Sequence, residues 1–226
     1  FKELDIEHGT LVLFLQLTII VSYENEVRPV PRARMVHYIA QYVANCHKSK
    51  KAVTRCDLFY ASVSAFWLAC KMEEVEPRDI YDMKNIARTL AKLSKQCDPD
   101  ISRRKLLAKE KEVLNILGFE LYKSHPVHYI MFYFEQTDVA KDKLDNVIFR
   151  AEIAITTNPA LLQYSPKLLA AALLSLYACD GCWNTDLLGY KSADYASVKN
   201  DILATMNDKK ANMLIEVKQL LEDSSC

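Results

Sequence analysis

The sequence predicts an all-α protein made of two tandem helical bundles, each built around an uncharged central helix. Three observations support this prediction: apolar residues follow helical spacing along almost the whole chain, only four of 226 residues are glycine, and two helix-length segments carry no charge. Hairpins and tight βα turns depend on glycine, so its scarcity favours long helices with short connections. Half of the residues are hydrophobic and 26% are charged, which excludes disorder over most of the chain.

The first part of the chain alternates apolar-periodic segments with short polar connections. The periodicity predicts helices over about 9–24, 32–47, 58–70, 77–83 and 102–117, and residues 84–100 are compatible with one more. The stretch from Arg28 to Pro31 is interpreted as a linker, with Pro31 suited to the first turn of the second helix. Thr54 or Asp57 is suited to cap the third helix, and Gly118 is placed to end the helix over 102–117.

The third predicted helix carries no charged residue from Leu58 to Cys70. A helix that is uncharged all round is normally the buried centre of a bundle. Ala61, Ala65 and Ala69 recur every four residues, which lets neighbouring helices approach closely. We therefore expect this helix to form the centre of the first bundle.

The second half of the chain repeats this layout. It predicts helices over about 128–135, 138–157, 168–179, 191–207 and 209–221. The uncharged stretch from Leu168 to Cys179 follows Ser165 and Pro166, a good cap and first position for a helix. The shared layout predicts a first domain over residues 1–122 and a second over 123–226.

One carboxylate falls on the apolar face of the helix predicted over 102–117. That face consists of Leu106, Leu107, Val113, Leu114 and Leu117. Glu110 lies one turn from two of these leucines, and a carboxylate facing a core needs a partner. Lys71, at the end of the uncharged helix, is the obvious cation. A lysine there also complements the helix dipole, so the residues alone favour a structural ion pair over a functional one.

Two sequence strings resemble the cyclin box. Residues 67–74 read Trp-Leu-Ala-Cys-Lys-Met-Glu-Glu with Pro77 after them, and the central helix of that family ends in Lys-x-Glu-Glu. Residues 110–121 read Glu-Lys-Glu-Val-Leu-Asn-Ile-Leu-Gly-Phe-Glu-Leu and are similar to the fifth helix of the box and its Phe-x-Leu exit. The resemblance covers about residues 9–207, and Pro126 with the aromatic helix after it fits the start of a second cyclin fold.

The resemblance implies a non-catalytic regulatory subunit that forms a heterodimer with a cyclin-dependent Ser/Thr protein kinase. Such a subunit activates the kinase by holding its regulatory helix in the active position. Lys71 and Glu110 match the family's paired lysine and glutamate at the kinase contact. Five residues match the apolar pocket for a kinase anchor: Leu68, Met72, Leu114, Phe119 and Leu121. The resemblance implies no catalytic residue, metal or cofactor, and an intracellular protein of the nucleus, the cytoplasm or both.

The sequence also departs from the family pattern. Residues 10–17 lack the Met-Arg-Ala-Ile-Leu-like sequence with which cell-cycle cyclins dock substrates, so docking by that patch is not expected. Asp180 stands where the second repeat would carry the counterpart of Lys71, which restricts this surface to the first repeat. The stretch from Pro77 to Ile80 and the His125-Pro126 junction lean towards transcription-type cyclins such as the H, K and L groups.

The charge distribution leaves one alternative function open. The formal net charge is zero, which argues against direct binding of nucleic acid. Residues 84–111, however, hold nine Lys or Arg and three Asp or Glu. The favoured interpretation of this span is a solvated face. The functional alternative is contact with a phosphorylated kinase segment or with RNA. It also keeps open a DNA-binding general transcription factor of the IIB type, which carries tandem cyclin-like repeats. The acidic residues Glu73, Glu74, Glu76, Asp79 and Asp82 are interpreted as solvated.

The cysteines and apolar runs set further expectations. Seven cysteines, several within apolar stretches, predict reduced and buried thiols in an intracellular protein. The CxxC at Cys179–Cys182 follows a helix C-terminus and lacks further metal ligands, so redox or zinc chemistry is not the favoured reading. The longest apolar run, Leu11–Val21, is too short to span a bilayer. We therefore expect neither a membrane span nor a signal peptide.

Overall fold

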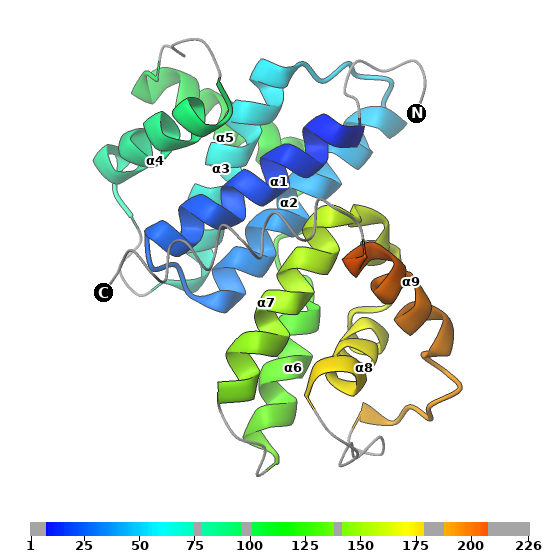
Figure 1. Cartoon of the computed structure of the whole chain (residues 1–226). Coiled ribbons are helices and arrows are strands. Elements are labelled where there is room, and N and C mark those ends of the chain that lie inside the picture. The colour runs from blue at the N-terminus through cyan, green and yellow to red at the C-terminus, as the bar shows by residue number, and fades with distance from the viewer. Residues whose placement is uncertain (1–7, 75–77, 96–100, 138–141, 179–187, 208–226) are drawn as a thin grey trace. The chain divides into compact units, whose positions relative to one another are not determined.

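The computed structural model describes residues 8–74, 78–95, 101–137, 142–178 and 188–207 (Figure 1). Every regular element within these ranges is a helix, so the predicted all-α class is confirmed. The chain divides into two compact units between Lys123 and Ser124, where the sequence predicted a division one residue earlier.

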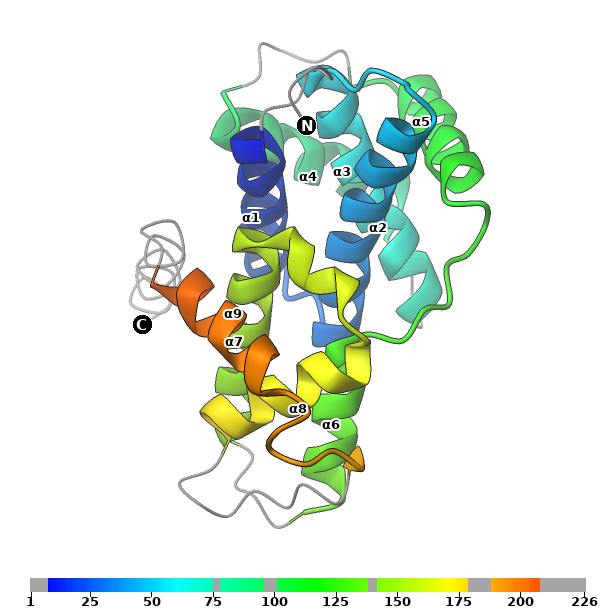
Figure 2. The same cartoon turned by 90° about the vertical axis from the view of Figure 1, so that its right-hand side faces the viewer.

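The first unit is arranged around one central helix. Its helices are α1 (His8–Glu24), α2 (Pro29–Lys48), α3 (Arg55–Glu73), α4 (Ile80–Leu93) and α5 (Arg103–Ile116). The other four helices all pack against α3 (Figure 2). Every residue from Ala61 to Cys70 is buried. The uncharged sequence is therefore explained by burial on all sides, as predicted.

The start of α3 is fixed by both of the residues predicted as alternative caps. The Thr54 hydroxyl accepts a hydrogen bond from the Asp57 backbone N–H, and the Asp57 carboxylate accepts one from the Thr54 N–H. This reciprocal capping box satisfies two backbone donors that the first turn of a helix leaves open.

Two predicted boundaries in this unit are wrong. The stretch from Arg28 to Pro31 is not a linker, because α2 already begins at Pro29 and its prolines occupy the first turn, where no N–H donor is required. The short helix predicted over 77–83 and the start of the 84–100 segment form one helix, α4. Asp79 caps α4 by accepting hydrogen bonds from the N–H groups of Tyr81 and Asp82, which sets its start.

The face of α5 that points into the core is narrower than predicted. Leu106, Val113 and Leu117 are buried, and Glu110 is buried with them at 8% exposure. Leu107 is 40% exposed, because a step of one residue along a helix rotates the side chain by about 100° away from the buried stripe. The core face therefore passes through Glu110 but not through Leu107.

The second unit is also arranged around an uncharged helix. Its elements are α6 (Pro126–Glu135), α7 (Asp142–Thr157), the 3₁₀ helix η1 (Pro159–Gln163), α8 (Pro166–Tyr177) and α9 (Ala196–Met206). The helices α6, α7 and α9 pack against α8, whose N-terminus is capped by the Ser165 hydroxyl as predicted. The helix expected over 209–221 lies outside the described residues.

Candidate partner-binding site

The ion pair predicted between Lys71 and Glu110 is present. Lys71 stands in the last turn of α3, and its Nζ lies 2.5 Å from Oε1 of Glu110 on α5. The carboxylate side chain is only 10% exposed, whereas the lysine side chain is 35% exposed. The pair therefore joins a buried acid to a cation that reaches the surface.

An aromatic ring holds the same lysine from a second side. Lys71 Nζ lies 3.7 Å from the ring centroid of Trp67, one turn earlier on α3, at a distance typical of a cation–π contact. The indole N–H of Trp67 donates to the backbone carbonyl of Arg78, 2.9 Å away, which fixes the ring. The ammonium group is thus held by a carboxylate and an aromatic ring of this chain.

The chain that leaves α5, which we call the exit segment (residues 119–122), presents aromatic side chains to solvent. Gly118 and Phe119 both have positive φ angles, 62° and 59°, so the chain turns sharply after the helix. This conformation is easy for glycine and costly for phenylalanine. Phe119 is 63% exposed and Tyr122 is 80% exposed. Large apolar side chains held at the surface in this way are typical of an interaction site.

Two residues of α2 hold the exit segment in place. The Arg34 guanidinium donates to the Leu121 carbonyl at 2.7 Å, and the Tyr38 hydroxyl donates to the same carbonyl at 2.8 Å. Arg34 also forms an ion pair with the Glu73 carboxylate, Nε to Oε1 2.5 Å, at the end of α3. These contacts fasten the exit segment beside the helix end that carries Lys71.

The part of the chain that holds this geometry is similar to a known family. A family model described as the N-terminal domain of cyclins matches residues 22–122, which include α3, α5 and the ion pair. Over these residues the chain is similar to cyclins. Cyclin-B1-1 of Arabidopsis thaliana is 25% identical over 172 residues, 75% of this chain and 36% of that protein. Cyclin-A2 of Xenopus laevis is 23% identical over 205 residues, 89% of this chain and 46% of that protein.

The fold agrees with a solved cyclin structure. The X-ray structure of a viral cyclin from herpesvirus saimiri has a TM-score of 0.63 and 16% identity, over 89% of this chain and 87% of that chain. The chain spans about a third to a half of the length of the two curated relatives named above. Those relatives are A- and B-type cyclins, so the lean towards the H, K and L groups gains no support from them and stays a prediction.

The five apolar residues that the resemblance assigns to a pocket differ in exposure. Phe119 is strongly exposed, and Met72, Leu114 and Leu121 are partly exposed. Leu68 lies one turn before Met72 on α3 and is only 4% exposed. It can therefore pack beneath the exposed residues but offers almost no surface for a partner. Binding of a kinase anchor by these residues remains a prediction.

The contact of Arg34 with Glu73 was not predicted from the sequence. Several acidic residues that were interpreted as solvated instead form ion pairs or cap a helix. Glu73 pairs with Arg34, and Glu74 lies 3.8 Å from Arg78 with its side chain only 13% exposed. Asp79 and Asp82 form the capping box of α4. In the sequence, Arg34 is only an arginine within the periodic pattern of α2. That pattern does not indicate which carboxylate it contacts.

The basic span over 84–111 is not uniformly solvated either. Lys109 is buried and donates to the Asp57 carboxylate at 2.7 Å and to both oxygens of Glu112 at 3.1 Å. Lys51 and the Tyr42 hydroxyl donate to the same glutamate, at 2.7 and 2.8 Å. This charge network, the residues Tyr42, Lys51, Asp57, Lys109 and Glu112, links α2, α3 and α5.

The thiols of the described part of the chain are mostly inert. Cys46 and Cys70 are buried as predicted, whereas Cys56 is exposed. Burial raises the pKa of Cys70 to about 12 and also raises the pKa of Cys46, so neither is a ready nucleophile at neutral pH. The CxxC at Cys179–Cys182 and Asp180 lie outside the described residues.

Two other features are absent from the described ranges. These ranges contain no group of three or more histidine, cysteine, aspartate or glutamate side chains able to hold a metal ion. None of their helices is long and apolar enough to cross a membrane.

Proposed function

We propose that this chain is the regulatory subunit of a cyclin-dependent Ser/Thr protein kinase, rather than an enzyme itself. In this proposal the kinase binds at Lys71 and Glu110, with Phe119 as the exposed apolar contact. The observation that carries the proposal is the preformed ion pair: a buried carboxylate, a cation held at the surface and an aromatic residue on the neighbouring exit segment. The match of residues 22–122 to the N-terminal domain of cyclins supports the proposed partner class.

The arrangement suits conformational activation. Protein kinases require a lysine–glutamate ion pair that involves their mobile regulatory helix. A subunit that binds only the conformation with this helix turned inward shifts the kinase population towards activity. Because Lys71 and Glu110 are already ordered, little side-chain entropy is lost when the kinase binds.

A pull-down from cell extract, read by mass spectrometry, tests the proposal. The native chain is compared with the double variant Lys71→Ala/Glu110→Ala. A neutral control, Lys92→Ala/Glu135→Ala, removes one exposed residue of each sign from α4 and α6. The proposal expects a Ser/Thr kinase with the native chain and the control, and its loss with the double variant. Transcription components with all three proteins and no kinase would support the IIB-type alternative instead.

A further inference from the structure

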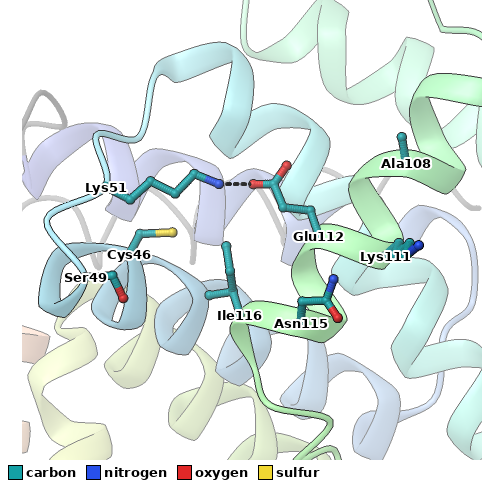
Figure 3. Close-up of a pocket in the computed structure, with 8 residues that line it drawn as sticks. All are labelled: Cys46, Ser49, Lys51, Ala108, Lys111, Glu112, Asn115 and Ile116. Atoms are coloured by element: carbon teal, nitrogen blue, oxygen red, sulfur yellow. Dashed lines mark hydrogen bonds and ion pairs between the residues drawn. The ribbon is translucent and has the colours of Figure 1, made fainter.

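A cavity of about 310 Å³ lies between the end of α2, the loop after it and α5 (Figure 3). It is lined by Cys46, Ser49, Lys51, Ala108, Lys111, Glu112, Asn115 and Ile116. Its volume is at the lower end of the range for ligand pockets, which fits a side chain or two of a peptide. Lys71 and Glu110 are not among the residues that line it.

The one acidic group in the lining is already paired with two lysines. The Glu112 carboxylate accepts four hydrogen bonds, one from Lys51, one from Tyr42 and two from Lys109. Three of these bonds end on Oε1 and one ends on Oε2, and the ammonium groups of Lys51 and Lys109 balance the negative charge that would attract a further cation. Burial alone would raise the pKa of Glu112, but these hydrogen bonds hold it below its usual value, and the group stays ionised.

Donors, in contrast, remain open on two sides of the cavity. Lys51 enters from the loop and gives one of its three N–H groups to Glu112, as Figure 3 shows. Lys111 and Asn115 line the cavity from α5, with the Lys111 ammonium directed away from Lys51 in Figure 3, and neither side chain has a hydrogen-bond or ion-pair partner among the described residues. The cavity therefore offers three separate donor side chains and suits an anion.

The positive charge continues beyond the cavity onto its rim. Lys48 and Lys50 are both exposed at the end of α2 and in the loop after it. Backbone hydrogen bonds from Lys50 to His47 and from Lys51 to Cys46 hold this loop in a fixed turn. Because Lys48 and Lys50 lie beyond a cavity that holds one or two side chains, the charge matches a segment of chain better than a small free anion.

We propose that this cavity binds a phosphorylated serine or threonine side chain of a partner protein. A phosphate monoester carries a charge of about −1.5 to −2 at pH 7 and three acceptor oxygens, which matches donors from Lys51, Lys111 and Asn115 better than a carboxylate does. The apolar lining from Ala108 and Ile116 suits the aliphatic part of that side chain. The proposal does not depend on the kinase-binding role of Lys71 and Glu110.

The test is an NMR titration of the full chain with the peptide acetyl-Gly-Ala-phosphoserine-Ala-Gly-amide. Its unphosphorylated form and inorganic phosphate are titrated in parallel. We expect saturable amide shifts confined to Ser49, Lys51, Lys111 and Asn115, for the phosphopeptide only or much more strongly than for phosphate. Lys111→Gln should weaken binding about fivefold, the value of one exposed charge contact.

Lys92→Gln is the matched control, because it removes a lysine that is also exposed but lies on α4, outside the cavity lining. Its affinity for the phosphopeptide should equal that of the native chain. Absence of saturable shifts would overturn the proposal, as would equal weakening by both variants, which indicates general charge attraction. Equal affinity for inorganic phosphate and phosphopeptide would also overturn it, because the site would then recognise an ion and not a protein segment.

Discussion

Replacing Lys109 by methionine probes the charge network that joins α5 to α2 and α3. The lysine side chain is 8% exposed and contacts Asp57 and Glu112, so its loss leaves two carboxylates facing each other without their shared cation. Methionine keeps the apolar stem and fills the same space, so the substitution mainly removes charge.

The expected cost follows from what the two carboxylates retain. Breaking a fully buried ion pair by removing one partner costs about 3–5 kcal/mol. Here Asp57 keeps its hydrogen bonds from Thr54, and Glu112 keeps Lys51 and Tyr42. Both side chains are also about a third exposed and gain water contacts. We therefore expect Lys109→Met to lower the free energy of unfolding by about 2 kcal/mol.

Urea unfolding followed by circular dichroism measures this difference. Lys111→Met is the control, because Lys111 lies two residues along the same helix and is exposed. Its free energy of unfolding should stay within about 0.5 kcal/mol of the native value. If Lys109→Met is equally neutral, the network does not stabilise the fold, and the reasoning from its burial is refuted.

Three further predictions concern the same unit. Hydrogen bonds hold the pKa values of Asp57 and Glu112 below normal despite their burial, so the stability they add above about pH 4.5 should vanish as pH falls through the folded-state values. The free energy of unfolding should therefore fall less steeply with decreasing pH in Lys109→Met than in the native chain, and parallel pH curves for the two proteins would contradict this. Gly118→Ala should cost about 1 kcal/mol in thermal unfolding from its positive φ alone, since nothing lies within 4 Å of an added Cβ; no cost would mean that the turn relaxes. Arg34→Ala should loosen the exit segment and weaken kinase binding about fivefold, and it should also lower the melting temperature because it removes a buried cation from Glu73; unchanged affinity would show that the contacts of Arg34 are irrelevant to binding.

Local signals in the sequence were enough to predict most helices. Thr54, Ser165 and Gly118 mark helix ends because capping and positive φ are requirements of the immediate neighbours. The uncharged stretch of α3 predicted its central position, since only a helix buried on all sides tolerates such a sequence. The start of α2 was missed because two prolines fit a linker and a first turn equally well.

The candidate site was predictable only in part, because some of its contacts join residues far apart in the sequence. Glu110 stood out because a carboxylate on an apolar helix face needs a partner, and Lys71 was the obvious one. The contacts of Arg34 with Glu73 and of Lys109 with Asp57 join residues 39 and 52 positions apart in sequence. Neither cation occupies a position that demands one particular partner, so only the packing of the helices reveals these pairs.

The most direct test of the central claim is a double-mutant cycle on kinase affinity. Binding of the kinase recovered by pull-down is measured by calorimetry for Lys71→Ala, Glu110→Ala and the double variant, beside the unfolding free energy of each protein. The proposed interface predicts a loss of about 2–5 kcal/mol in binding for each single variant, no larger loss for the double variant, and a smaller effect on folding. Normal kinase affinity in all three variants, together with a clear loss of stability, would show that the ion pair is purely structural.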